Sequence, residues 1–251
     1  MRLSISGMRF RPTLLPTLVA AIFTALTLYL GYWQQGRAAE KELVQAEFDA
    51  RGKQPAVILT EASLGQDMRY RRVIAAGTWH AMGEIFLDNK VNEGVAGYDV
   101  VTPLKLHGGN VYVLVNRGWI ARGPAYPEPP VVPRLPESGS VTGILVQPTS
   151  RFFELSAESV QGQVWQNLTI ARYRAATALD VLPYVLLADR VEPPLKQVVE
   201  QPSAGVDKHK EYMLTWYSLA ATTTILWIVL NFRPATGRET AANGSDLGNS
   251  K

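Results

Sequence analysis

The stretch PTLLPTLVAAIFTALTLYLGYWQQG, residues 12–36, carries no charged side chain and is apolar over most of its length. A helix needs about 20 mostly apolar residues to cross a bilayer, because backbone groups in lipid must be hydrogen-bonded within the segment itself. A second uncharged stretch, Tyr212 to Phe232, has the same property. The sequence therefore predicts a membrane protein with two transmembrane α-helices, residues 12–36 and 209–232.

Basic residues outnumber acidic ones in the two tails outside these spans. The basic side chains there are Arg2, Arg9, Arg11, Arg233, Arg238 and Lys251. Short basic flanks stay in the cytoplasm, whereas long loops are translocated. We therefore expect a cytoplasmic basic tail at residues 1–11 and a polar, disordered cytoplasmic tail at residues 233–251. Residues 37–208 then form one outward-facing, periplasmic domain.

The first span has two alternative interpretations. It could be a cleaved signal peptide, since Ala38 and Ala39 follow it, but the apolar region of a signal peptide is only about 7 to 15 residues long. It could belong to a mitochondrial inner-membrane protein, but only residues 1–11 precede the span, which is short for a presequence. We expect a bacterial inner-membrane protein that crosses the membrane twice.

Between the spans, strand patterns dominate. Residues 37–51 are rich in helix-forming residues, so the first helix should continue to Gly52, and a short helix is predicted at residues 171–179. The Pro-rich run at residues 124–136 is a connector or, as the less favoured alternative, a partner-binding surface. We expect a mainly antiparallel β (α+β) domain, with strands at residues 71–79, 84–89, 98–106, 110–120, 140–146, 164–170 and 183–191.

The sequence lacks the residues that several kinds of functional site require. The chain contains no cysteine and only three histidines, His80, His107 and His209, which are far apart in the sequence. A thiolate site, a CxxC redox pair and a multi-histidine metal centre are therefore not expected. The basic residues form no patch with interleaved aromatics, so no nucleic-acid partner is expected. We also find no phosphate loop or nucleophile elbow, and predict that the protein is not an enzyme.

Within the domain, Asn116-Arg117-Gly118-Trp119 directly follows an apolar run. The favoured interpretation is a Gly-permitted bulge or turn with a packed Trp119. The alternative is that Arg117 contacts an anion or a partner. Two pairs of acids, Asp88 with Asp99 and Glu154 with Glu158, are expected to be solvated and unperturbed.

Small residues recur every three or four positions along both spans, and such stripes let membrane helices approach closely. On the first span they are Thr17, Ala20, Thr24, Thr27 and Gly31, and on the second they are Thr215, Ser218 and Thr222. The favoured interpretation is that the two spans pack on each other. The alternative is that they dock onto a helix of another membrane protein.

Aromatic residues gather at the outer ends of both spans, where interfacial aromatics are common on any membrane helix. His209 precedes Tyr212 and Trp216 by three and seven residues, so the three share a helix face. An imidazole, flat aromatic walls and nearby cations are also what a haem requires, which makes haem a candidate ligand. The other aromatics are Tyr29, Tyr32, Trp33 and Tyr217, and the cations are Arg37, Lys208 and Lys210.

Six motifs together resemble the Surfeit locus protein 1 family, assembly factors of cytochrome c oxidase. The resemblance runs from Leu30 to Ala220 and includes both spans. The motifs are Leu30-Gly31-Tyr32-Trp33-Gln34 with Arg37 and Lys41; Arg71 and Val73 before Gly77; Gly97-Tyr98 leading to Thr102-Pro103-Leu104; Val115 to Trp119; Val164 to Leu168; and His209 with Tyr212, Trp216, Leu219 and Ala220.

The resemblance implies an inner-membrane protein that helps mature oxidase subunit I at haem A insertion. The family's proposed haem A ligand falls on His209, with Tyr212, Trp216, Trp33 and Arg37 as the expected surroundings. Implied partners are subunit I, membrane lipid and, as a candidate, the haem A synthesis machinery. Three positions depart from the common family pattern: Ala121, Thr169 and Lys208, the last next to the histidine.

Two other functions were weighed. A scaffold that docks nascent subunit I without binding haem is the main alternative. A membrane-anchored sensor would need a cytoplasmic output element, and the tail after Phe232 is too short and polar to be one.

Overall fold

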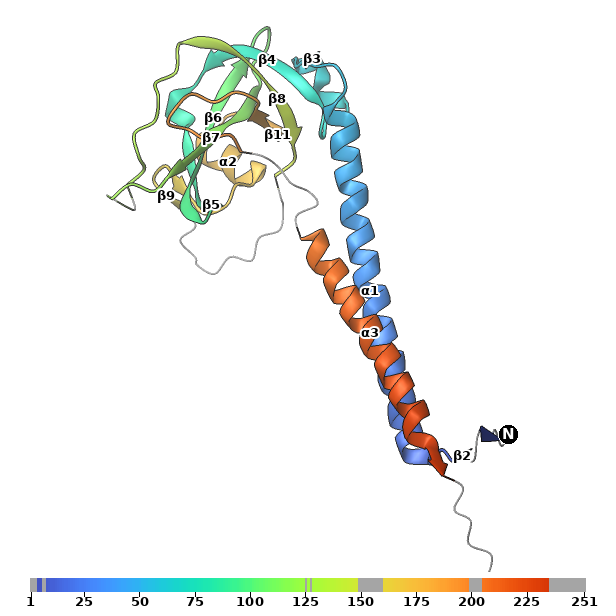
Figure 1. Ribbon diagram of the computed structural model, residues 1–251. Helices are drawn as coiled ribbons and strands as arrows, with labels where there is room; N and C mark the ends of the chain where they lie inside the picture. The colour runs from blue at the N-terminus through green and yellow to red at the C-terminus, as the bar shows by residue number, and fades with distance from the viewer. Residues whose placement is uncertain are drawn as a thin grey trace, which may run out of the picture. The chain divides into compact units, whose positions relative to one another are not determined.

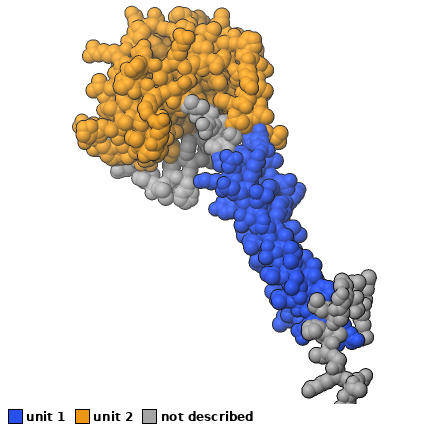
Figure 2. Space-filling model, in the orientation of Figure 1, with its two compact units in different colours: residues 1–42, 203–251 blue, residues 43–202 orange. Residues whose placement is uncertain are grey.

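A computed structural model describes residues 4–5, 8–124, 126, 128–148, 160–198 and 205–234. The chain divides into two compact units, shown in different colours in Figure 2. Unit 1 combines Met1–Glu42 with Ser203–Lys251, and unit 2 is Leu43–Pro202. The predicted domain, residues 37–208, starts and ends six residues outside unit 2.

Unit 1 contains most of α1 (Leu14–Gly52) and all of α3 (Val206–Asn231), the two long helices of Figure 1. Both are long and apolar enough to cross a membrane. Their large apolar side chains are mostly exposed, as at Leu15 and Leu230, each 73% accessible. The helices correspond to the spans predicted at residues 12–36 and 209–232.

The two tails meet at one end of this helix pair. Strand β1 (Ser4–Ile5) pairs with β2 (Met8–Phe10), and β2 pairs antiparallel with β12 (Phe232–Pro234). The tail expected to be disordered from residue 233 therefore begins in a strand, and residues 235–251 lie outside the described part. The Phe10 ring packs edge-on against Trp227, with centroids 5.5 Å apart. Both tails thus leave the helix pair at the same end.

Helix α1 continues beyond its apolar part, as residues 37–51 predicted, and ends at Gly52. Its last turns belong to unit 2, where the Phe48 ring contacts the Tyr70 ring at 5.2 Å between centroids. Arg69 donates two hydrogen bonds to the Glu47 carboxylate, and this interaction raises the pKa of the guanidinium. Charged and aromatic contacts therefore hold this part of the helix to the domain.

Unit 2 is built from a nine-stranded sheet with short helices. The strands not yet defined are β3 (Val57–Ile58), β4 (Arg72–Trp79), β5 (Ile85–Asn92), β6 (Val95–Leu106), β7 (Tyr112–Ala121), β8 (Ser138–Val146), β9 (Val160–Gln161), β10 (Val164–Trp165) and β11 (Val181–Ala188). The helices are η1 (Glu61–Gly65), η2 (Ala81–Gly83) and α2 (Ile170–Thr177).

Five of these strands close into a ring. Along the sheet the order is β4-β8-β11-β7-β6, and β4 also pairs with β6. Pairing is mainly antiparallel, as predicted, but β3 with β4, β7 with β11 and β5 with β10 are parallel. Closure removes the exposed strand edges that an open sheet would present.

The ring encloses one apolar core, to which all five strands contribute. Side chains alternate along a strand, so Val113 and Val115 belong to this core while Leu114 faces the opposite side. There a second core, with Leu114, Trp165 and Tyr173, lies under α2. The Tyr173 hydroxyl donates to Gly83 O at 2.6 Å, and burial raises its pKa.

The strand predicted at residues 164–170 is wrong beyond Trp165. Only Val164–Trp165 pairs in the sheet, and α2 begins at Ile170. Thr169 caps this helix, since its Oγ1 accepts a hydrogen bond from Arg172 N at 3.2 Å. An N-cap needs a short side-chain acceptor with non-helical backbone, and this requirement overrides the apolar pattern. The helix expected at residues 171–179 is confirmed.

The bulge predicted at Asn116-Arg117-Gly118-Trp119 is confirmed, although β7 does not end there. The register against β6 shifts between Val100 and Val101, and Gly118 has a φ of +134°, in the region that favours glycine. Trp119 is 4% accessible and its indole N–H donates to Lys90 O at 3.0 Å. The large side chain therefore lies in the core.

Arg117 has its partners within the chain. Its side chain is 7% accessible and donates to Glu84 Oε2 and to Pro133 O, both at 2.6 Å. The second bond ties the Pro-rich run to β7. The run has no helix or strand among its described residues. These contacts give Arg117 a structural role, in line with the favoured interpretation.

The expectation that Asp88 and Asp99 are solvated is wrong. Each is 6% accessible. Asp88 accepts a 2.6 Å hydrogen bond from Arg122, which raises the pKa of that guanidinium, and Asp99 lies 3.6 Å from Lys90 Nζ. Buried carboxylates are expected to be paired. The other pair, Glu154 and Glu158, lies outside the described residues.

Replacing Trp119 by Ala should destabilise the domain. Removing a buried aromatic side chain costs about 3–5 kcal/mol, and here the indole hydrogen bond is lost as well. The midpoint of urea unfolding of the purified full chain should fall, with faster proteolysis of the domain. Met82→Ala is the matched control, because Met82 is 87% accessible and its loss should change neither. An unaltered midpoint for Trp119→Ala would refute its role in packing.

Candidate functional site

The candidate site is built around His209, in the first turn of α3. Its Nδ1 lies 2.7 Å from Gln34 Oε1 on α1. An amide oxygen only accepts hydrogen bonds, so this contact is a hydrogen bond in the tautomer that carries its proton on Nδ1. That tautomer has its lone pair on Nε2, the form in which imidazole binds a metal ion.

Polar contacts at both ends define the register of the antiparallel helices. Near the tails, Trp227 Nε1 donates to Thr17 Oγ1 at 3.1 Å. At the other end, Lys210 Nζ lies 2.6 Å from Glu42 Oε1. The bond between His209 and Gln34 lies close to this second end. It therefore sits where the apolar part of both helices gives way to charged residues.

Two flanks of the helix pair can be told apart. The Tyr217 hydroxyl donates to Gln35 Oε1 at 3.1 Å, which marks one flank. At about 100° per residue, Trp33 and Arg37 lie about 200° around α1 from Gln35. Tyr212, five residues before Tyr217, lies about 140° around α3 from it by the same geometry. Trp33, Arg37 and Tyr212 therefore belong to the opposite flank.

The predicted site residues thus come together on one flank, at similar heights. The helix register places Trp33 level with Thr215 and Trp216. His209 and Trp216 are half-buried, whereas Tyr212 and Trp33 are 56% and 49% accessible. Arg37 pairs with Glu40 at 2.7 Å and remains half-exposed. This flank therefore presents exposed aromatic surface, a half-buried imidazole and a cation close to one another.

Two members of the predicted aromatic group lie elsewhere. Tyr32 is 72% accessible, and the helical period puts it away from the flank that carries Trp33 and Arg37. Tyr29 is 65% accessible and lies four residues before Trp33, so it shares that flank one turn nearer the tails. Tyr217 belongs to the other flank through its bond to Gln35. Two of the six aromatics named from the sequence, Tyr32 and Tyr217, therefore lie away from the candidate site.

The small-residue stripe on α1 faces α3, as expected for spans that pack on each other. Its five positions are buried or half-buried. Thr27 is fully buried, and a Cβ added at Gly31 would lie 2.6 Å from the Tyr217 ring. The small side chains of α1 make room for large ones on α3.

The stripe predicted on α3 is wrong, because Thr215, Ser218 and Thr222 are all exposed. Since α1 already supplies the small residues, α3 can pack with large side chains. Its buried and half-buried positions along the helix are Val206, His209, Met213, Trp216, Tyr217, Ala220, Thr223, Trp227 and Asn231.

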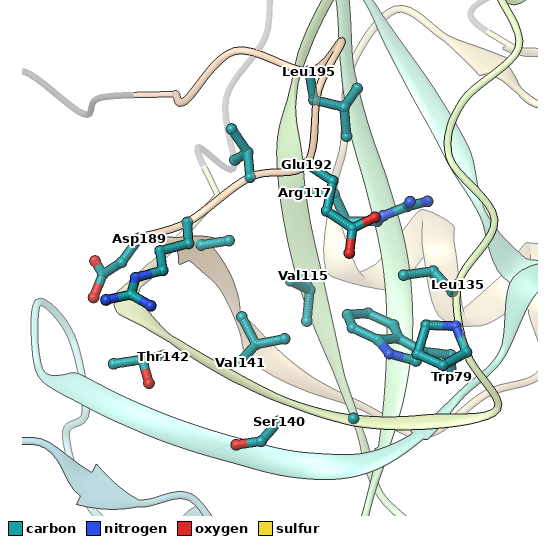
Figure 3. Close-up of a pocket in the computed structure, with 15 residues that line it drawn as sticks. Trp79, Val115, Arg117, Leu135, Ser140, Val141, Thr142, Asp189, Glu192 and Leu195 are labelled. Atoms are coloured by element: carbon teal, nitrogen blue, oxygen red, sulfur yellow. The ribbon is translucent and has the colours of Figure 1, made fainter.

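Three hollows lie among the described residues of unit 2, and two of them are lined by residues of β7. One, of about 610 Å³, is lined by Trp79, Val115 and Val141 from the ring core, with Glu192 at its margin (Figure 3). Arg117 is part of the lining, but Glu84 and Pro133 engage its guanidinium.

The second hollow, of about 720 Å³, is where two sequence motifs meet. Asn116 and Trp119 come from β7, and Gln166, Asn167 and Leu168 come from the segment between β10 and α2. The two segments lie nearly fifty residues apart, so the sequence did not reveal their proximity. Amide side chains next to an indole can contact a polar chain segment.

The sequence also did not assign a role to Gln34. Gln34 was named only as the last residue of the motif Leu30-Gly31-Tyr32-Trp33-Gln34. The only feature that could have pointed to it is its position, because it is an amide at the end of an apolar helix. Its contact with a residue 175 positions away requires the three-dimensional structure.

Comparison with known proteins identifies the family of this chain. The model of the SURF1 family matches residues 21–221, so the chain belongs to the SURF1 family. It is 27% identical to a SURF1-like protein of Rickettsia conorii over 224 residues, which covers 86% of this chain and 90% of that protein. It is 26% identical to Surfeit locus protein 1 of Xenopus tropicalis, over 80% of this chain and 71% of that protein. The family resemblance seen in the sequence is thereby confirmed.

The contact between Gly31 and Tyr217 predicts a clear difference between two glycines of α1. Gly31→Ala should separate the helices, because overpacking costs about 1–3 kcal/mol. Gly36→Ala is the matched control: no atom lies within 4 Å of an added Cβ, and the change should stabilise α1 by about 1 kcal/mol. Since the chain lacks cysteine, dyes attached at Leu14→Cys and Val229→Cys can report separation by energy transfer during SDS titration. Equal midpoints for both variants would refute the close approach.

Proposed function

We propose that this protein is a non-enzymatic assembly factor of cytochrome c oxidase that holds haem A beside nascent subunit I. The observation that carries the proposal is the contact of His209 Nδ1 with Gln34 Oε1, on the side of the ring away from Nε2, next to exposed aromatic surface. Membership of the SURF1 family supports the class of function. Haem A is cargo in this proposal, because the protein would bind and release it unchanged.

The proposal places α1 and α3 across the inner membrane of a bacterium. Their length, their apolar composition and the exposure of their large side chains support this placement. The pairing of β2 with β12 supports a hairpin with both tails on one side. The basic tails favour the cytoplasm for that side, which leaves unit 2 in the periplasm.

The residues around His209 suit a haem. Its Nε2 would bind the iron, as histidine does in many haem proteins. Tyr212, Trp216 and Trp33 would contact the macrocycle, and Arg37 would pair with a propionate in place of Glu40. Bound haem supplies the iron centre that the oxidase needs, and this chain supplies only the contacts that hold it.

A second candidate function is a scaffold that docks subunit I without binding haem. The hollow lined by both the Asn116–Trp119 and the Gln166–Leu168 segments favours it, because it offers amides and an indole to a partner's polar segment. The haem A synthesis machinery is a further candidate partner, and membrane lipid would contact the exposed apolar helix faces.

Reporter fusions test the topology. A reporter active only in the periplasm, inserted in the Pro-rich run at Glu128, should give signal, and one fused after Lys251 should give none. A reporter active only in the cytoplasm should give the reverse. Cytoplasmic activity at Glu128 would contradict the periplasmic placement of unit 2.

The ligand assignment is tested by His209→Ala. The variant should be as abundant and as well inserted as the wild type, since a half-exposed residue contributes little to stability. It should lack haem absorbance when purified from cells that make haem A, and oxidase activity should fall. His107→Ala, on an exposed turn, and His80→Ala should change neither the haem absorbance nor the oxidase activity. Full haem occupancy in His209→Ala would exclude this ligand.

A deletion strain separates assembly from haem synthesis. Cellular haem A content should stay normal while oxidase activity falls. Loss of haem A itself would place the protein in haem A synthesis and contradict the proposal.

A further inference from the structure

Two adjacent glutamines on α1 make different contacts with α3. Gln34 Oε1 lies 2.7 Å from His209 Nδ1, whereas Gln35 Oε1 accepts a 3.1 Å hydrogen bond from the Tyr217 hydroxyl. Gln34 is half-buried and Gln35 is exposed. Only the first of these bonds reaches an imidazole, which binds metal ions in its neutral form.

The bond to Gln34 has two consequences for the imidazole. It selects the tautomer with the proton on Nδ1, so that Nε2 is the acceptor. It also restricts rotation of the ring, because turning the ring away would break the bond. A histidine that ligates a metal ion commonly donates its other N–H to such a partner, which fixes the orientation and raises the basicity of the ligand.

The placement of Gln34 also matters. The amide comes from α1 and the imidazole from α3, so the tautomer of His209 depends on the packing of the two helices. That packing is set by the contact of Gly31 with Tyr217, which lies one turn from Gln34. The imidazole is therefore oriented only when the helix pair is formed.

We propose that Gln34 is a positioning residue that holds His209 ready to bind the haem iron through Nε2, an inference that rests on the proposed function. Gln34 does not touch the iron. It acts only through the His209 ring.

The test compares Gln34 with Gln35 in the full chain, purified in detergent and titrated with haem A. Gln34→Leu keeps the size of the side chain and removes the acceptor, and it should weaken haem A binding on the order of tenfold. Gln34→Glu replaces the acceptor with a stronger one. It should retain binding and shift the reduction potential of the bound haem to more negative values, because a more basic imidazole favours the ferric iron.

Gln35→Leu and Gln35→Glu are the matched controls, and both should bind haem A with the affinity and reduction potential of the wild type. A purely structural role for Gln34 would lower the SDS midpoint of the helix pair without changing the potential in Gln34→Glu. Retained binding in Gln34→Glu together with a shifted potential therefore supports positioning.

The outcomes distinguish this inference from the function on which it rests. If the wild type binds no haem A, or His209→Ala binds it equally well, the proposed function fails. If His209→Ala loses haem while both Gln34 variants match the wild type in affinity and potential, the positioning role of Gln34 is overturned and the ligand assignment stands.

Discussion

The close approach of α1 and α3 is the constraint on which unit 1 depends. Gly31 leaves room for the Tyr217 ring, and the fully buried Thr27 satisfies its hydroxyl within α1, by bonds to Phe23 O and Thr24 O. Between helices in an apolar surrounding, packing and hydrogen bonds have to supply the attraction, since burial of apolar surface supplies little. The small residues on one helix and the large ones on the other supply that packing, and the contacts of Trp227 with Thr17 and of Lys210 with Glu42 fix the register.

Features with a local cause were predictable from the sequence. Both long helices follow from uninterrupted apolar composition, and the Gly118 bulge follows from one glycine after an apolar strand. The grouping of His209, Tyr212 and Trp216 required only the helical period. Their grouping with Trp33 and Arg37 followed from the position of all five at the outer ends of the two spans.

Features that depend on distant partners were not predictable in this way. Ring closure requires β4 to pair with both β6 and β8. The residue pattern of β4 indicates a strand, but it does not specify which strands pair with it. Thr215, Ser218 and Thr222 were misassigned because their spacing is indistinguishable from that of a packing stripe. Packing against α1 determines which face of α3 is buried. Asp88 was taken as solvated because its partner Arg122 lies 34 residues further along the chain.

The arrangement of unit 1 has a consequence for the order of assembly during synthesis. Its two helices come from opposite ends of the chain, with all of unit 2 between them. A ribosome releases α3 only after the intervening sheet has been made, and chains begin to fold from the N-terminal side as they emerge. Helix α1 therefore lacks this packing partner until α3 has been made. The imidazole of His209 and the amide of Gln34 meet only after that step, so a chain without α3 lacks the proposed haem-binding face.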